Sequence, residues 1–185
     1  MNFDLTQEQQ MIKKTIKEFA DKAVAPGAIE RDKTKEFPKE IFKQLSDMGM
    51  MGLPFGEEYG VAGADTVSFA IVTEELSRAC ASTGITYSAH ISLGGAPLNL
   101  FGTEEQKQKY LTPICTGESF GAFGLTEPNA GSDAGGTETR AIEDGDDWGA
   151  GGQGPLWSQN PKSRCDVDDY GRENSDYEGL CKGSS

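Results

Sequence analysis

The residues with the clearest chemical potential lie in one loop of small residues. Residues 124–134 read Gly-Leu-Thr-Glu-Pro-Asn-Ala-Gly-Ser-Asp-Ala, with hydroxyls at Thr126 and Ser132 and a carboxylate at Glu127. Small residues and a fixed turn allow the backbone to approach a flat or charged ligand closely. The same residue types are also ordinary turn residues. From the residues alone, a ligand-binding loop and an ordinary surface loop both remain open.

The histidine and the cysteines are the other side chains that could do chemistry. His90, the only histidine, lies in an apolar stretch, where a side chain of the core or of a pocket wall is expected before a catalytic one. Cys80, Cys115, Cys165 and Cys181 are widely spaced and form no C-x-x-C pair. Two disulfides are conceivable, but free thiols in a reducing compartment are the expectation, and no metal site is predicted.

The acidic composition argues against polyanionic partners. The 185 residues include 17 Lys and Arg against 30 Asp and Glu, a formal net charge of -13, which disfavours nucleic acid and anionic membrane surfaces. A bound anion would need local donors. The first residues show no basic and apolar leader pattern, and no run approaches the ~20 apolar residues of a membrane span. We therefore expect a soluble, cytoplasmic protein that contacts neither nucleic acid nor membrane.

Helical periodicity dominates residues 1–118 and predicts an N-terminal helical bundle. Residues 5–25 open with a capping box at Thr6 and Gln9, and Pro26 with Gly27 can end them. Residues 84–101 are apolar on most sides, which suits a helix buried in the centre of the bundle. Further helices are predicted from Pro38 to a stop at Gly49, from a cap at Asp65 or Thr66 to about Cys80, and from a capping box at Thr103 and Gln106 to Gly117, with a glycine-rich loop at 52–65.

The periodicity changes at Ser119. Residues 120–125 fit an extended strand, and a second strand is expected at 137–142 before a turn at 144–146. From residue 149 onwards, closely spaced glycines and scattered polar residues predict little stable structure. The fold class is therefore mainly α: a helical bundle domain at 1–118, the first strands of an incomplete β-domain at 119–148, and an irregular tail at 149–185.

The loop at 124–134 resembles the flavin-binding signature of the acyl-CoA dehydrogenases, in which glycine, an aliphatic residue, threonine and glutamate are followed by glycine, serine and aspartate. The resemblance covers residues 1–148 and is closest to short-chain, butyryl-CoA dehydrogenase-like bacterial members. Similar family landmarks in family order are Leu5-Thr6 with Glu8-Gln9, Met51-Gly52-Leu53-Pro54, Glu74-Glu75-Leu76-Ser77, and residues 101–107 with Tyr110-Leu111.

The resemblance implies FAD-dependent oxidation of a fatty acyl-CoA to the trans-2-enoyl-CoA, with hydride passing from the β-carbon to flavin N5. It implies that Phe123, Leu125 and Thr126 lie against the isoalloxazine and that Ser132 reaches the flavin diphosphate or the CoA part of the substrate. The helix at 87–98 would line the acyl pocket, with plain core packing as an equal alternative. Intact members are expected to form homotetramers that pass electrons to an electron-transferring flavoprotein.

No catalytic residue is expected within this chain. The family's proton-abstracting glutamate belongs to a later helical domain, so Glu127 is expected to serve the loop and not the chemistry. The chain thus corresponds to the N-terminal part of such an enzyme and is expected to lack full activity. The alternatives are a non-catalytic helical module that binds acyl-CoA or a protein partner, and a product that never folds stably.

The resemblance breaks after Trp148. The family would continue with an aliphatic strand, whereas this chain continues Gly-Ala-Gly-Gly. The codons GGA GCT GGA GGG encode these four residues and, read one base later, encode Glu-Leu-Glu-Gly, which suits a family member. A frame shift in the gene is therefore the leading hypothesis for residues 149–185.

Overall fold

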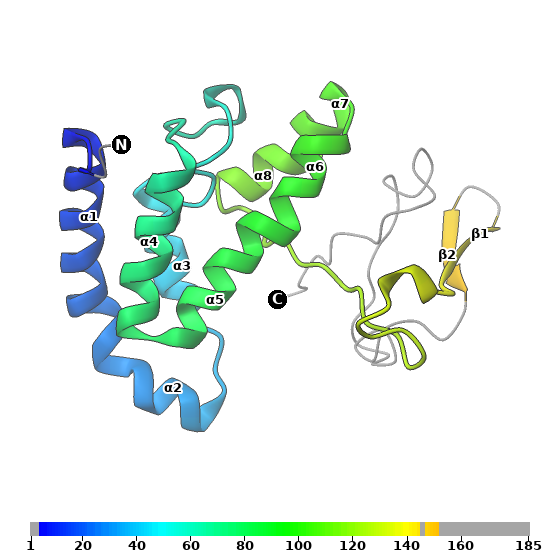
Figure 1. Cartoon of the computed structure of the whole chain (residues 1–185), viewed down its shortest axis with the longest axis horizontal. Coiled ribbons are helices and arrows are strands. Elements are labelled where there is room, and N and C mark those ends of the chain that lie inside the picture. Colours follow the sequence, from blue (N-terminus) through cyan, green and yellow to red (C-terminus); the bar gives the residue numbers. More distant parts are fainter. Residues whose placement is uncertain (1–3, 145–146, 152–185) are drawn as a thin grey trace. The chain divides into compact units, whose positions relative to one another are not determined.

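The computed structural model describes residues 4–144 and 147–151, and the chain divides into two compact units, Met1–Ser119 and Phe120–Ser185. The first unit is helical, and the described part of the second contains the small-residue loop and a two-stranded hairpin (Figure 1). The mainly α fold class is therefore confirmed. The boundary between the units lies one residue from the position expected from the sequence.

The first helix, α1 (Gln7–Phe19), begins at the predicted capping box. Thr6 Oγ1 accepts from the Gln9 N–H, and Gln9 Oε1 accepts from the Thr6 N–H, which satisfies two donors at the helix start. Its apolar face buries Ile16 completely. The capping box is thus confirmed at both of its hydrogen bonds.

The helical path does not end at Pro26, which corrects the expected stop. A π-helical segment (Ala20–Val24) and a 3-10 turn (Ala25–Gly27) lead directly into α2 (Ala28–Thr34). Pro26 is tolerated because it lies in the first turn of the 3-10 segment, where its missing N–H costs no hydrogen bond. Helix α2 was not predicted, because it has no buried residue and therefore no apolar face that repeats at helical spacing.

Two predicted helix boundaries in the middle of the first unit are confirmed. Helix α3 (Lys39–Asp47) buries three apolar side chains and is closed by Gly49, whose φ of 71° lies in the left-handed region that glycine adopts easily. Helix α4 (Thr66–Ala79) begins at Asp65, which accepts the Ser68 N–H at 2.7 Å.

The connection between α3 and α4 forms part of the core. Although it was predicted only as a glycine-rich loop, its apolar side chains are buried. A Cβ built on Gly52 would lie 2.8 Å from the Cβ of Cys115, so glycine permits this close approach. The buried residues of the connection are Met51, Leu53, Phe55, Tyr59 and Val61.

One continuous helical path follows α4. It consists of α5 (Ala81–Ala89), a π-helical segment (His90–Gly95) and α6 (Ala96–Phe101). The predicted burial on most sides is wrong for this path, because Ile85 and Leu100 are 66% and 70% exposed. Other residues of the path, Tyr87, Ile91 and Leu98 among them, are buried, so burial is confined to part of its circumference among the described residues.

A further continuous helical path completes the first unit. The predicted capping box at Thr103 and Gln106 opens α7 (Glu104–Gln106), a π-helical segment (Lys107–Leu111) follows, and α8 (Thr112–Cys115) ends near Gly117. Leu111 and Ile114 are completely buried. This path therefore contributes apolar side chains to the core of the first unit.

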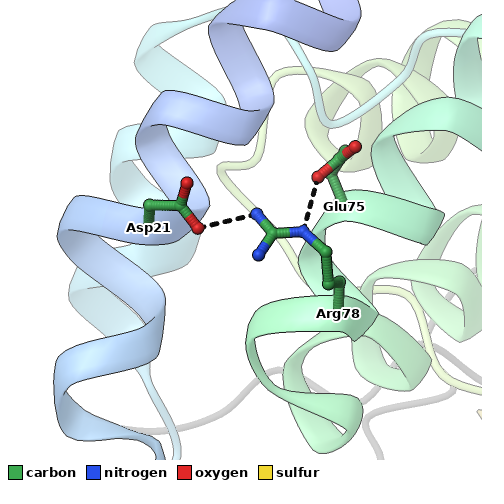
Figure 2. A network of polar contacts seen from close by, with 3 residues as sticks. All are labelled: Asp21, Glu75 and Arg78. Carbon is green, nitrogen blue, oxygen red and sulfur yellow. Dashed lines mark hydrogen bonds and ion pairs between the residues drawn. The ribbon is translucent and has the colours of Figure 1, made fainter.

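An ion-pair network ties α4 to the segment after α1, two elements that lie side by side (Figure 1). The guanidinium of Arg78 donates from Nη2 to Asp21 Oδ1 at 2.7 Å and from Nε to Glu75 Oε2 at 2.8 Å (Figure 2). Glu75 is buried, so Arg78 also serves to satisfy a carboxylate that water does not reach.

The second unit differs from the predicted strands. Residues 120–125 form no strand, because a strand needs a neighbour to receive its hydrogen bonds and none pairs with this segment among the described residues. Strand β1 (Arg140–Asp144) pairs antiparallel with β2 (Asp147–Gly151), with Glu143 opposite Trp148. Asp144 pairs with Asp147, and residues 145–146 of the expected turn lie outside the described residues.

Part of the predicted irregular tail lies in a strand, because β2 extends to Gly151. Residues 152–185 lie outside the described residues, so the remainder of that prediction stays untested. Among the residues that the structure describes, no helix has the length and apolar character needed to cross a membrane.

Candidate functional site

The small-residue loop is organised around a tight turn between Glu127 and Ala130. The Glu127 N–H donates to the Ala130 carbonyl at 3.0 Å, and the Ala130 N–H donates back to the Glu127 carbonyl at 3.2 Å. Pro128 and Asn129 occupy the two corner positions, as their turn propensities favour. The loop therefore has a defined backbone conformation.

The carboxylate of Glu127 braces this turn from inside. It accepts the N–H of Glu138 at 2.7 Å and the N–H of Thr139 at 3.0 Å, one on each oxygen, and the residue is only 7% exposed. Hydrogen bonding by Thr139 and by the backbone of Glu138 lowers the pKa of the Glu127 carboxyl. A general base works best with a pKa near the working pH, so a lowered pKa suits a structural carboxylate better than a proton acceptor.

The four predicted cofactor contacts lie along the loop on both sides of the braced turn. Phe123 and Leu125 are 39% and 45% exposed, and Thr126 and Ser132 are exposed. Two apolar side chains next to a hydroxyl, carried by a fixed backbone, suit a flat apolar ring with a polar edge. The residues present thus fit a flavin.

His90 is a core residue in this structure. It is buried, and its Nε2 lies 3.1 Å from the Ile114 carbonyl oxygen. Burial lowers the pKa of His90 to about 4, despite backbone hydrogen bonds with Ile114 and Met51 that favour the charged form. The ring is therefore neutral near pH 7 and connects the π-helical segment His90–Gly95 to the Ile114 carbonyl of α8.

The helical path through α5 and α6 has two distinct faces. Tyr87 points inward and donates its hydroxyl hydrogen to the Met50 carbonyl at 2.7 Å, and Ile91 and Leu98 are buried with it. Four other large apolar side chains of the path are exposed in the part of the chain that the structure describes. We call this set the exposed stripe; it consists of Ile85, Leu93, Leu100 and Phe101.

The brace partners of Glu127 were not found from the sequence. The two hydrogen bonds at 2.7 and 3.0 Å come from backbone N–H groups of Glu138 and Thr139, which every residue except proline possesses, so residue type carries little signal for them. One weaker signal was present in the sequence. Glu127 is an acidic residue at the first position of a Pro-Asn turn, and Glu138, whose N–H it accepts, follows 11 residues later. A buried loop carboxylate commonly needs such donors.

Comparison with known proteins agrees with this arrangement. Residues 6–118 match the family model described as "Acyl-CoA dehydrogenase, N-terminal domain". The chain therefore belongs to the acyl-CoA dehydrogenase family. It is 56% identical over 160 residues to the probable acyl-CoA dehydrogenase YngJ of Bacillus subtilis, a match that covers 86% of this chain and 42% of the relative.

Solved structures show the same fold. Butyryl-CoA dehydrogenase from Megasphaera elsdenii superposes with a TM-score of 0.77 at 42% identity, over 82% of this chain and 41% of that one. An acyl-CoA dehydrogenase from Bacillus anthracis, solved in complex with FAD, gives a TM-score of 0.75 at 39% identity over 80% of this chain and 26% of that one. The chain thus spans less than half the length of these relatives.

Proposed function

We propose that this chain forms the N-terminal helical domain and the first flavin contact of an FAD-dependent acyl-CoA dehydrogenase. The complete protein would oxidise a fatty acyl-CoA to the trans-2-enoyl-CoA. The observation that supports this best is the braced turn at Glu127, which follows directly on a helical domain of the matching family. The FAD complex of the Bacillus anthracis relative and the butyryl-CoA dehydrogenase of Megasphaera elsdenii suggest the cofactor and the substrate class.

The roles of individual loop residues follow from the signature. Phe123 and Leu125 would pack against the isoalloxazine, the Thr126 hydroxyl would donate to its polar edge, and Ser132 would reach the diphosphate or the CoA part of the substrate. When bound, FAD supplies the hydride acceptor for the β-carbon. The chain's own contribution is then to orient the ring and to exclude water from one side of it.

We place no proton-abstracting base for this reaction among the described residues. Removal of a weakly acidic α-proton needs a positioned carboxylate and a polarised thioester carbonyl, and the loss of one such group typically lowers the rate by ~10² to 10⁴. Glu127 is engaged by two backbone amides and is therefore a poor candidate for the base. We propose that the base, the homotetramer and the docking site for an electron-transferring flavoprotein belong to the complete family protein.

Flavin content after purification tests the cofactor assignment. The 185-residue chain should bind FAD weakly or not at all, because one loop supplies only part of a site. An extended variant with a family-like continuation after Trp148 should be purified with flavin absorbance, and Thr126→Ala should lower its flavin occupancy more than Thr73→Ala, which alters a helix of the first unit. Tightly held, stoichiometric FAD on the short chain would contradict the proposal.

Dye reduction with butyryl-CoA tests the chemistry. The short chain should show only background rates and the extended chain should show turnover. If the short chain reduces dye, and Glu127→Gln abolishes that rate while the exposed control Glu118→Gln keeps it, then Glu127 is the base and the proposal is wrong.

A non-catalytic helical module is the second candidate, and the exposed stripe favours it. Monomeric chains seldom leave several large apolar side chains uncovered on one helix face unless something binds there. A stable monomer that binds acyl-CoA, with no flavin even after extension beyond Trp148, would support this candidate over the enzyme.

We also propose that a change of reading frame underlies part of the sequence after Trp148. The codon arithmetic allows a family-like continuation from the same bases. The alignment with YngJ covers 86% of the chain and so continues past Trp148 in the frame as given, which weighs against a change at that codon itself. Sequencing the gene from the Trp148 codon onwards decides the point. An intact frame, with no family-like sequence in the other frames downstream, would end this proposal.

A further inference from the structure

The helical path from α5 to α6 contributes no formal charge to the surface. Residues 81–103 contain no Asp, Glu, Lys or Arg, although charged residues make up 25% of the chain. His90, the histidine of this path, is buried. The exposed stripe therefore lies in a segment that is electrically neutral within a strongly acidic chain.

The side chains of the stripe project away from the core of the first unit. Leu93 and Leu100 each follow a buried residue, Ile91 and Leu98, by two positions. Two positions correspond to a rotation of ~200° about a helix axis. The stripe residues thus lie across the path from the side chains that pack inward, and Leu93 and Leu100 are 47% and 70% exposed.

A π-helical segment keeps the large side chains of the stripe in line. Ile85 and Leu93 are eight positions apart, whereas Leu93 and Leu100 are seven apart. The π-helical segment His90–Gly95 interrupts the longer step, and a π turn accommodates about one residue more than an α turn. Both steps therefore span two turns, and the large side chains recur with the spacing of a helix-pairing seam.

Small side chains occupy the positions between the large ones. Ala89 lies midway between Ile85 and Leu93, and Ala96 follows Leu93 by three positions and precedes Leu100 by four. Both alanines are partly exposed. A series of large and small residues at steps of three and four forms knobs and holes that interdigitate with a second helix of the same kind.

The net charge favours a copy of this chain at the neutral face. Two copies that each carry a formal charge of -13 repel one another, and the repulsion is weakest where the facing segments carry no charge. Apolar side chains also gain free energy when they leave water together. A second copy therefore approaches most easily through the exposed stripe.

We propose that the exposed stripe is an isologous interface through which two copies of this chain pair antiparallel about a two-fold axis near Leu93. The midpoint of the series from Ile85 to Leu100 lies at residues 92–93. A two-fold axis there sets Ile85 of one copy opposite Leu100 of the other, and Ala89 opposite Ala96. The pairing requires neither flavin nor acyl-CoA, so it is independent of the enzymatic assignment.

The expected interface is small, because one helical path of each copy supplies it. Stable specific pairs bury about 1,200–2,000 Å² in total, and two single helical paths fall at or below the low end of that range. The pair should therefore be weak, with a dissociation constant of ~10 to 100 μM.

Sedimentation velocity of the full chain tests the association. The mass should rise from 19.8 kDa toward twice that value as the concentration increases from ~1 μM to ~500 μM. Salt should strengthen the pair, because an ionic strength of ~0.5 M screens the repulsion between the two acidic copies. A monomer at every concentration, or growth beyond a dimer, would overturn the proposal.

A charge placed at the axis should separate the copies. Leu93→Glu brings two carboxylates together in the dimer and should weaken it at least ~10-fold. Leu100→Ala should weaken it without any change of charge. The control is Ile29→Glu, which adds the same charge to α2 at a side chain that is 74% exposed, and its dimer should stay near that of the parent. Circular dichroism confirms that each variant is folded, and equal weakening in Leu93→Glu and Ile29→Glu would refute the interface.

Disulfide trapping tests the antiparallel direction. Cys80 and Cys115 are free thiols, so the background for this experiment replaces all four cysteines by serine. After mild oxidation, a mixture of Ile85→Cys and Leu100→Cys chains should form a disulfide-linked pair, because a disulfide needs Cα atoms about 4.4–6.8 Å apart. Either variant alone should stay unlinked. Linked pairs from the single variants with none from the mixture would show that the proposed arrangement is wrong.

Discussion

The side-chain amide of Gln9 donates a hydrogen bond to Asp65 Oδ2 at 2.7 Å, although the two residues are 56 positions apart. Gln9 belongs to the capping box of α1, and Asp65 is the N-cap of α4. The starts of two neighbouring helices are therefore held together by residues that each cap one of them. This contact makes the two caps interdependent.

The coupled caps predict a pH-dependent loss of stability in Asp65→Ala. Hydrogen bonds from Ser68 outweigh desolvation and lower the pKa of Asp65, so its stabilising contribution is present above the unfolded pKa of ~3.9 and is lost as pH falls through the folded pKa. The variant should melt at a lower temperature than the parent at pH 7, and the difference should narrow below about pH 4. Thermal melts by circular dichroism measure it.

The control for this prediction is Asp32→Ala, which removes an exposed acid from α2. Asp32→Ala changes the net charge by the same amount as Asp65→Ala but removes no helix cap. Its melting temperature should therefore stay near that of the parent. A pH-independent loss in Asp65→Ala would show that the carboxylate does not act through its charge.

The crossing of α4 and α5 predicts that Gly84→Ala destabilises the first unit. A Cβ at Gly84 would lie 2.0 Å from Ser77 Oγ and 2.7 Å from Ser77 Cα, and the backbone atom cannot move aside alone. Overpacking costs about 1–3 kcal/mol, against a gain of about 1 kcal/mol for alanine over glycine in a helix. Urea denaturation should therefore show a net loss of stability. Gly131→Ala, where a Cβ meets no atom within 4 Å, serves as the control, and a more stable Gly84→Ala would refute the close crossing.

The hydrogen bond between Tyr87 and the Met50 carbonyl predicts a loss of stability in Tyr87→Phe. The ring would still fill its place in the core, but the carbonyl oxygen would lose its donor, at a cost of about 1–3 kcal/mol for a buried unsatisfied group. Equilibrium unfolding in urea provides the measurement. Tyr110→Phe is the matched control. If both variants lose a similar free energy of unfolding, the hydrogen bond to the Met50 carbonyl does not account for the loss in Tyr87→Phe.

The brace in the loop predicts that Glu127→Gln weakens the turn between Glu127 and Ala130. A carboxamide keeps one acceptor oxygen but places an NH₂ group against the second backbone N–H, so one of the two bonds is lost. Hydrogen exchange at the amides of Glu138 and Thr139 should become faster, while amides of α4 stay protected. Unchanged protection at both amides would contradict the brace, and Glu118→Gln provides the charge-matched control.

Local signals were predictable from the sequence, because each depends on residues close together in the chain. The capping boxes at Thr6 and Thr103, the cap at Asp65 and the glycine stop at Gly49 all involve contacts within one helical turn. Such contacts form wherever the residues occur in that spacing. The order of helices in the first unit followed from these signals.

Features that depend on distant partners were not predictable in the same way. The segment 120–125 has the composition of a strand but lacks a paired neighbour in the described structure. Helix α2 lacks the apolar periodicity that marks a buried face, and the exposed stripe has it without being buried. The brace at Glu127 depends on backbone amides, which the sequence does not distinguish.

The hydrogen bonds to the Glu127 carboxylate also decide whether the loop loses its backbone conformational entropy during folding or during ligand binding. Fixing the backbone of one residue costs roughly 1–2 kcal/mol, and in this chain the turn between Glu127 and Ala130 is ordered by hydrogen bonds from within the loop itself. That loss belongs to folding and is not repeated on binding. A ligand that reaches the loop therefore meets a preorganised surface, and its affinity for the chain depends on how many contacts it makes and not on how much backbone it must order.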